Sequence, residues 1–541
     1  MAQVFQTAST QGFPLGIDWS KPAEAVDIRA LVQAHNCEYS GTDGALQTVP
    51  GIRILYTADK DITSIYYDVD RKCWYFTSDG KLHKTEDWKS VTELGALTGT
   101  DRPRYCTFGG DVLVASGGKL QAVSGAGDTL STVSSSPDSC NFVSSNSGSV
   151  ITASTSDHRL HWSAIGDYTS WTNDSNNSAS AQYVDVGYKD QGCIISVSFL
   201  SKAIIVYKEY GRAYQVIGNP HTGTLAVYPL SETAYCAGSS VSLNDHSYYI
   251  GNAGLMSFVP TTTYANIKPE QTGLHINAQL IRITEKTAAM WYVPTRKQMW
   301  ILPSEKSEYI FIYHYLPRYT DGRGVFTTRT LAHNLHDVET LDDDVYIAYG
   351  NKIGILDEAI DTDDGKQIET AVTSGNLLAE KLFILLMSYS FVTSNKIAGY
   401  GTVEISNKKA KALQFKVSEK RLYDDTGPLY DANTALANQS FTKLLKIGGG
   451  PNRSLQIKIY IAKGSVAIRQ FDYTYSEVYT HELRRNVPSE RNPPGGFYPL
   501  CGGEDPEGNP LPGGGAECPA ERGGRRNPPA CAVGGHAFRS V

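Results

Sequence analysis

The 541-residue chain has no apolar run of the ~18 residues that a membrane-spanning helix requires, so we expect no membrane span. Its longest apolar run, residues 382–387, has the length of a core strand. The first residues form neither a basic stretch nor an apolar stretch, so we expect no secretory signal. Charged residues amount to 19%, below the usual ~25%, and the formal net charge is −7. A net acidic chain is not expected to be a general binder of polyanions.

Closely spaced cysteines are also missing. No C-x-x-C pair occurs, which argues against a zinc ribbon or a thioredoxin motif. Isolated cysteines indicate reduced, buried thiols in a protein made in the cytoplasm. The nine cysteines are Cys37, Cys73, Cys106, Cys140, Cys193, Cys236, Cys501, Cys518 and Cys531. The last three of these could form cross-links or stay reduced.

What the chain does have favours strands and tight turns. It contains 33 Tyr and 50 Gly, with many Ser and Thr and only 5 Met. Apolar segments alternate with short turns, as in residues 65–77, 194–207 and 291–302. Such hairpins recur every ~35–50 residues, a period typical of propeller blades. A radial array is favoured over a sandwich because each four-stranded blade covers the face of its neighbour.

The predicted fold class is all-β: a β-propeller-like radial array, a further β-rich domain and a Pro/Gly-rich C-terminal tail. We place a lead-in at residues 1–60, with a helix predicted over residues 23–34. The propeller-like domain covers residues 61–365. A β-rich accessory domain, residues 366–487, packs on the propeller or completes it. Residues 488–541 hold 10 of the 24 Pro and 12 of the 50 Gly, so we expect no packed core there.

Charge is distributed unevenly along the chain. Residues 336–365 carry ten acids and one lysine, whereas residues 396–470 carry 13 Lys+Arg and five acids. Two solvated faces would explain this, as would head-to-tail complementarity between the subunits of a ring. A third interpretation is an acidic channel through which DNA slides without sticking. The candidate channel-lining residues are Asp342, Asp343, Asp344, Asp361, Asp363 and Asp364.

The sequence singles out no catalytic, cofactor-binding or metal-binding residue. Residues 361–365 resemble the start of a calcium loop, but the twelfth position is Val372 rather than a glutamate, which favours a simple turn. His158 and His161 would point to opposite faces of a strand. No G-x-S-x-G, H-E-x-x-H or P-loop pattern occurs. Acids are plentiful enough for a glycosidase pair, but no pattern selects one.

An ordered set of segments resembles the tail nozzle family, also called tail tubular or stabilisation proteins, of short-tailed bacteriophages (podoviruses). The segment at residues 161–171, HWSAIGDYTSW, is similar to the W-S-x-x-x-D-x-x-x-W/F stretch of that family. The resemblance extends over roughly residues 30–400 and leaves out the Pro/Gly-rich tail. The other segments that carry it are residues 36–51, 192–197, 204–208, 214–218, 291–300 and 345–357.

The resemblance implies a structural virion protein rather than an enzyme, with no cofactor. It implies a propeller with added β-domains, assembled as a homohexamer at the distal end of the tail. Its partners would be the tail adaptor ring, tail fibre, spike or needle proteins, and the DNA that passes through during ejection. The alternative is a glycan-binding or glycan-cleaving propeller that recognises a receptor. A pocket on the propeller axis with paired carboxylates or stacked aromatics would favour that alternative.

Overall fold

The computed structural model describes the backbone of residues 6–10, 12–40, 44–125, 127–187, 190, 192–260, 267–315, 324–378, 383–405, 411–415, 440–441 and 454–478. The chain divides into two units, residues 1–486 and residues 487–541. The Pro/Gly-rich tail, with Cys501, Cys518 and Cys531, lies outside the described residues.

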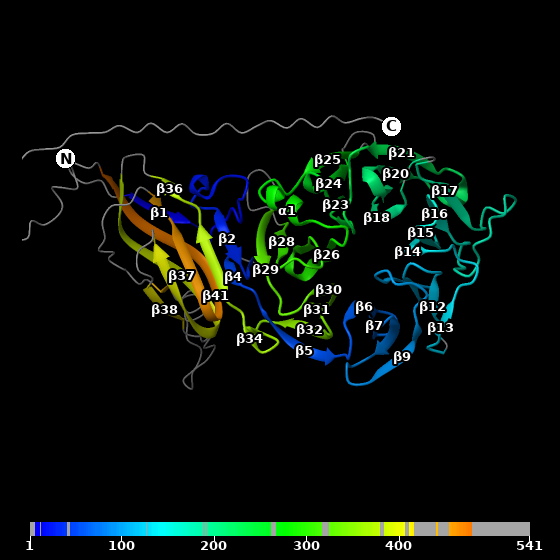
Figure 1. Ribbon diagram of the computed structural model, residues 1–541, viewed down its shortest axis with the longest axis horizontal. Helices are drawn as coiled ribbons and strands as arrows, with labels where there is room; N and C mark the ends of the chain where they lie inside the picture. The colour runs from blue at the N-terminus through cyan, green and yellow to red at the C-terminus, as the bar shows by residue number, and fades with distance from the viewer. Residues whose placement is uncertain are drawn as a thin grey trace, which may run out of the picture. The chain divides into compact units, whose positions relative to one another are not determined.

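Seven antiparallel four-stranded blades make up most of the described chain (Figure 1). In blades 1 to 6 the four strands follow one another along the chain, and tight hairpins connect many of them. The blades are: blade 1, β6 (Ile62–Asp68), β7 (Cys73–Ser78), β8 (Lys81–Thr85) and β9 (Val91–Ala96); blade 2, β10 (Arg104–Phe108), β11 (Asp111–Ala115), β12 (Gln121–Val123) and β13 (Leu130–Thr132); blade 3, β14 (Cys140–Asn146), β15 (Ser149–Ser154), β16 (Arg159–Trp162) and β17 (Gln182–Asp185); blade 4, β18 (Ile194–Leu200), β19 (Ala203–Lys208), β20 (Ala213–Ile217) and β21 (Ala226–Ser231); blade 5, β22 (Val241–Leu243), β23 (His246–Gly251), β24 (Gly254–Pro260) and β25 (Ile267–Gln271); blade 6, β26 (Ala289–Val293), β27 (Gln298–Leu302), β28 (Ile310–His314) and β29 (Val325–Arg329).

Blade 7 is assembled from both ends of the propeller. Its first three strands are β30 (Leu335–Leu341), β31 (Asp344–Tyr349) and β32 (Lys352–Asp357). Its outer strand is β5 (Gly51–Thr57), which pairs antiparallel with β32 (Figure 1). The predicted lead-in therefore contributes a propeller strand. Pairing the last blade with an N-terminal strand closes the ring and leaves no free sheet edge between its ends.

A hydrophobic cluster fills each junction between neighbouring blades. Between blades 3 and 4, for example, Trp162 packs with Val197 and Val206, and all three are buried. Comparable clusters join blades 1 and 2, 2 and 3, 4 and 5, 5 and 6, 6 and 7, and 7 and 1. The all-β, propeller-like fold expected from the sequence is therefore confirmed, because the face of each blade is covered by the next.

A second β-structure continues from blade 6. One sheet runs β26-β27-β28-β29-β2-β35-β41-β37-β38, and its core contains Phe13, Leu46, Val372, Ile459 and Phe471. Its two longest strands, β37 (Phe383–Ile405) and β41 (Ile457–Val478), pair antiparallel over most of their length. The remaining strands are β1 (Gln6–Thr10), β2 (Leu31–His35), β3 (Cys37–Tyr39), β4 (Leu46–Thr48), β33 (Thr362–Asp363), β34 (Lys366–Gln367), β35 (Thr370–Ser374), β36 (Leu377–Leu378), β38 (Lys411–Phe415), β39 (Ser440–Phe441) and β40 (Ser454–Leu455).

The helix predicted over residues 23–34 is wrong. Only Ala23–Ala25 form a 3-10 turn, η1, and residues 31–35 form strand β2. Leu31 pairs with Ser374 of β35, so long-range strand pairing overrides the local helix propensity. The other helical segments described are α1 (Asn277–Ile283), η2 (Glu209–Gly211), η3 (Pro220–Thr222) and η4 (Pro294–Arg296). None of the helices in the described ranges is long and apolar enough to cross a membrane.

Candidate functional site

A cavity of about 800 Å³ lies where the first strands of the seven blades converge. All seven blades contribute, either through the first strand or through the segment just before it. Tyr66 comes from β6, Asn141 from β14, Ser196 from β18, Ser240 from just before β22, and Trp291 from β26. The volume lies within the ~300–1,000 Å³ typical of small-molecule sites. We call this space the axial cavity.

Asp337 of β30 joins several blades at the wall of the axial cavity. Its Oδ1 atom accepts hydrogen bonds from Trp291 Nε1 at 2.7 Å and from an Arg102 guanidinium nitrogen at 3.1 Å. Its Oδ2 atom accepts a bond from the backbone N–H of Ile65, at 3.0 Å. Asp337 is buried, so these donors replace its water. Blades 1, 6 and 7 and the segment leading into blade 2 thus meet at one carboxylate.

Two arginines at the start of blade 2 line the cavity, and they differ in their charge partners. Arg102 is ion-paired with Asp337 and lies over the Trp291 ring, 4.8 Å from its centroid. Arg104 also lines the cavity, but within the described part of the chain it makes neither a hydrogen bond nor an ion pair. Burial and then the nearby Arg102 charge lower the pKa of Arg104 to about 10, which leaves it a cation at neutral pH. The Asp337 charge opposes this lowering, so Arg104 is a cation that Asp337 balances only in part, through space.

Glu339 lines the same cavity, two residues beyond Asp337 on β30. Burial raises the pKa of Glu339 to about 7, and the neighbouring Asp337 charge adds to the increase. The backbone N–H of Thr340 donates to Glu339 Oε1 at 3.1 Å, which partly opposes the shift. Near neutral pH a large fraction of Glu339 is therefore a neutral acid that can donate a hydrogen bond.

The cavity wall also carries a stacked aromatic pair. The rings of Tyr66 and Tyr105 lie 5.2 Å apart at an interplanar angle of 9°. Their hydroxyls hydrogen-bond to Thr107 and Ser64 respectively, at 2.8 and 2.6 Å. Because these polar ends are engaged within the blades, we infer that the pair offers mainly apolar ring surface to the cavity.

At the rim the charges are solvent-exposed or paired. Lys286 reaches Glu209 at 3.4 Å, and Asp101, Lys286 and Glu305 are exposed. Water and salt screen exposed charges, so they affect a ligand inside less than Arg104 and Glu339 do. The interior thus holds an Arg102–Asp337 pair, an unpaired arginine and an acid that is easily protonated.

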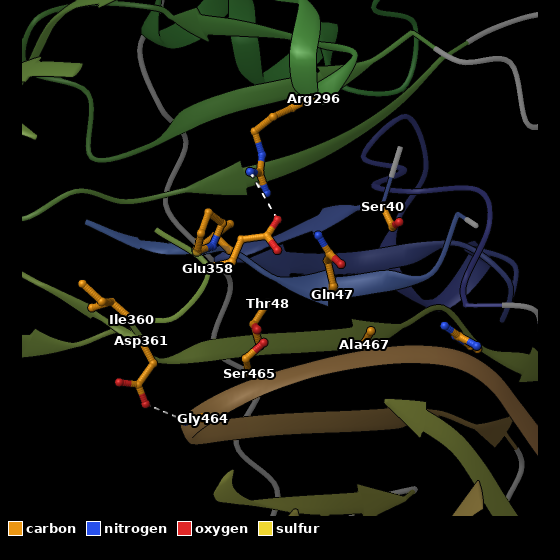
Figure 2. A pocket seen from close by; sticks show the side chains of 13 residues that line it. Ser40, Gln47, Thr48, Arg296, Glu358, Ile360, Asp361, Gly464, Ser465 and Ala467 are labelled. Carbon is orange, nitrogen blue, oxygen red and sulfur yellow. Dashed lines mark hydrogen bonds and ion pairs between the residues drawn. The ribbon is translucent and has the colours of Figure 1, made fainter. Parts of the chain in front are cut away.

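A second, smaller pocket of about 190 Å³ is lined by propeller residues and by strands of the second β-structure (Figure 2). Arg296, in the first turn of blade 6, points toward Glu358, and their charged atoms are 3.7 Å apart (Figure 2). Asp361 accepts a hydrogen bond from the backbone N–H of Gly464, at 3.0 Å. These contacts connect the first turn of blade 6 to the loop after blade 7, and that loop to β41, which points to a structural clamp.

Glu38 of β3 anchors this clamp and is fully buried. It accepts hydrogen bonds from Arg296, from Gln298 Nε2 at 2.9 Å and from Gln47 Nε2 at 3.0 Å. Burial alone would raise the pKa of Glu38. The Arg296 charge and the three donors outweigh burial and lower the pKa to about 2. Glu38 is therefore an ionised, structural carboxylate.

The acidic segment predicted to line a channel does not reach the axial cavity. Asp342, Asp343 and Asp344 are exposed at the turn between β30 and β31. The cavity wall takes Asp337, Val338 and Glu339 from the same strand instead. That this acidic segment lines a channel formed by several subunits stays a prediction.

Asp361, Asp363 and Asp364 make contacts within the chain, around the hairpin β33–β34. Asp363 accepts bonds from the backbone N–H of Ala332 and from the Tyr349 hydroxyl, at 2.7 and 3.1 Å. Asp364 contacts Lys352 at 2.5 Å and His333 at 2.8 Å. The residues that resemble a calcium loop thus form a hairpin whose acids have protein partners.

The sequence pattern gave no reason to choose Arg104, Asp337 or Glu339. Each is a single charged residue on a short strand, and the three come from two blades far apart in the chain. A weak signal was present, because first strands of blades otherwise carry few charges. Among the other residues considered, His161 pairs with Asp157 at 2.9 Å, and the described cysteines are free.

Comparisons with known proteins return only distant structural likenesses. No family model and no curated protein matches the chain. BamB from Moraxella catarrhalis is 11% identical, with 65% of this chain and 97% of that chain covered and a TM-score of 0.36. The WD40 propeller domain of Doa1 is 13% identical, covering 57% and 97%, with a TM-score of 0.39. The extracellular domain of the one-component system BT4673 from B. thetaiotaomicron is 9% identical, covering 79% and 62%, with a TM-score of 0.42.

Proposed function

We propose that the protein is a non-enzymatic structural subunit of a short phage tail, a tail nozzle that forms a hexameric ring around a DNA-ejection channel. The observation that carries the proposal is the hydrogen-bonded continuity between the propeller and the second β-structure. Strand β2 pairs with β29 of blade 6 at His35 and Thr328 on one side, and with β35 over most of its length on the other. One sheet then extends from blade 6 to β38.

Such continuity suits a subunit that bears load. Separate domains on a linker move relative to each other, whereas a shared sheet resists bending through its ladder of hydrogen bonds. The buried Glu38–Arg296 pair adds a second connection between the same parts. A passive mechanism follows, in which the ring stays rigid and movement of loops at its distal end opens the channel.

Most of the segments that resemble the nozzle family lie in blades, whereas residues 36–51 lie mainly in strands β3 and β4 of the second β-structure. In the segment at residues 161–171, Trp162 is fully buried between blades 3 and 4, and Trp171 packs against the cluster between blades 2 and 3. The proposal also places the protein in the virion tail, made in the host cytoplasm, in contact with the adaptor ring and with fibre, spike or needle proteins.

Negative-stain electron microscopy tests the proposal on the purified full chain, alone and mixed with a tail adaptor ring. Six-fold rings with a central opening in either sample support the nozzle. Rings only with the adaptor also support it and indicate templated assembly. Monomers in both samples refute it.

The axial cavity favours a second function, carbohydrate binding. Asp337 and Glu339 bring two carboxyl groups to its wall, and Tyr66 and Tyr105 add a stacked aromatic pair. We propose this as a binding activity, because the contacts of Asp337 are those of a structural hub. Titration of the purified chain with neutral and acidic monosaccharides tests it, and the absence of saturable binding by any of them overturns it.

A further inference from the structure

We propose that the axial cavity selects a carboxylate-bearing sugar, with the Arg104 guanidinium holding the carboxylate. This inference rests on the carbohydrate-binding function proposed above and names its ligand class. It is independent of ring formation, since every residue that it uses lies on one chain.

The charge of the cavity interior favours an anionic ligand. Arg102 is neutralised by Asp337, which also accepts from Trp291 and from the Ile65 backbone. Asp337 therefore has little capacity left for Arg104, which makes no hydrogen bond of its own within the described residues. The half-buried Arg104 guanidinium therefore keeps donors that are open to the cavity, where the effective dielectric constant is lower than that of bulk water. An anionic ligand would accept from these donors and balance the charge.

The geometry of the Arg104 guanidinium selects the shape of the anion. A guanidinium presents parallel N–H donors that match the two oxygens of a carboxylate, and a bidentate pair of this kind is strong and directional. Burial strengthens the interaction further, because the effective dielectric constant inside the cavity is lower than that of water. A planar carboxylate fits Arg104 in this way, whereas a neutral sugar offers it only hydroxyl oxygens.

The rest of the ligand is inferred from the remaining wall of the cavity. The stacked Tyr66–Tyr105 pair supplies ring surface of the kind that packs against the apolar C–H face of a sugar. The volume of about 800 Å³ is large enough for one or two pyranose rings. The exposed Thr287 also lines the cavity, and its hydroxyl can donate to a sugar oxygen. A small inorganic anion would leave most of this wall unused.

The protonation state of Glu339 affects the binding of an acidic ligand. When protonated, it removes a negative charge that would repel the ligand and adds a hydrogen-bond donor. The charged and titratable groups around it are Asp337 on the same strand and Tyr66 on β6, with the Thr340 backbone N–H bonded to Oε1. Tyr66 stays neutral because burial raises its pKa. Affinity for an acidic sugar should therefore increase as the pH falls from 8 to 6.

Isothermal titration calorimetry on the full chain tests the inference, with D-glucuronate, D-glucose and inorganic phosphate as probes. The test variant is Arg104→Gln. A second variant, Arg104→Lys, keeps the positive charge but removes the parallel N–H donors of the guanidinium. The matched control is Arg282→Gln, an exposed arginine on α1. Circular dichroism and thermal melting establish that each variant is folded.

The expected result is saturable glucuronate binding, at least tenfold tighter than glucose binding. Arg104→Gln should weaken glucuronate binding at least tenfold and Arg104→Lys by a smaller factor, with Arg282→Gln unchanged. Glucose binding equal to glucuronate binding, or an Arg104→Gln variant that binds glucuronate normally, overturns this inference and leaves the carbohydrate function standing. Phosphate that competes equally well overturns the sugar class. No binding of either sugar overturns both proposals.

Discussion

Replacing Asp337 tests whether this carboxylate holds the propeller ring together. Asp337→Asn preserves the size of the side chain. If the amide oxygen takes the place of Oδ1, the bonds from Trp291 and Arg102 survive, and the new NH2 group faces the Ile65 N–H that Oδ2 accepted before. The variant thus loses one buried hydrogen bond and the negative charge that neutralises Arg102.

A buried donor left without an acceptor costs about 1–3 kcal/mol, and breaking a partly buried ion pair adds to this cost. Because Arg102 remains partly exposed, solvent reduces the second contribution. We expect Asp337→Asn to lower the free energy of unfolding by about 2–4 kcal/mol. Asp337→Ala removes every acceptor and should cost more, about 3–5 kcal/mol.

Urea unfolding followed by tryptophan fluorescence measures the effect, with a readout close to the change because Trp291 bonds directly to Asp337. Asp343→Asn is the matched control, since Asp343 lies on the same blade in an exposed turn. It should change stability by less than about 0.5 kcal/mol. A loss below about 1 kcal/mol for Asp337→Asn would refute the reasoning that this carboxylate joins the blades.

Three further predictions concern charge. The pKa of Glu38 is lowered to about 2 from an ordinary 4.5, so its stabilising contribution is present above pH 4.5 and lost as the pH falls toward 2. Glu38→Gln should be less stable than wild type at pH 7. In acid titrations followed by circular dichroism, the variant should also lose less stability than wild type between pH 4.5 and pH 2. The raised pKa of Glu339 has the opposite effect on stability, which declines as the pH rises from 4.5 through 7. Glu339→Gln should therefore be more stable than wild type at pH 8 but not at pH 4. Equal gains in stability at both pH values would contradict the assignment. Lysine at residues 342–344 should leave the fold intact, because these positions are exposed, but impair ring assembly or DNA ejection if the turn lines the channel; unchanged assembly and ejection would exclude that role.

The resemblance to the nozzle family and the axial cavity lead to separate experiments. Ring formation depends on surfaces between subunits, whereas the cavity lies within one propeller. A ring-forming protein that binds no sugar and a monomer that binds glucuronate are therefore distinct outcomes. The first would leave Arg104 as a solvated arginine, and the second would make the propeller a receptor-binding module.

Local patterns in the sequence are sufficient to predict the hairpins of the blades. Alternating apolar residues with tight turns between them require hairpins, and hairpins at ~35–50-residue spacing suit stacked blades. Residues 65–69 and 73–77, for instance, are predicted to be paired strands, and the structure has β6 at Ile62–Asp68 paired with β7 at Cys73–Ser78. These features follow from neighbours in the chain, so a reader of the sequence can find them.

The closure of the ring and the position of the cavity depend on contacts between residues far apart in the chain. Strand β5 joins β32 across some 300 residues of chain, and β2 forms as a strand because β29 and β35 flank it. Arg104, Asp337 and Glu339 meet because blades 2 and 7 both adjoin blade 1 in a closed ring. Long-range pairing and the burial of single charges depend on closure of the whole propeller, and no local pattern of residues encodes that geometry.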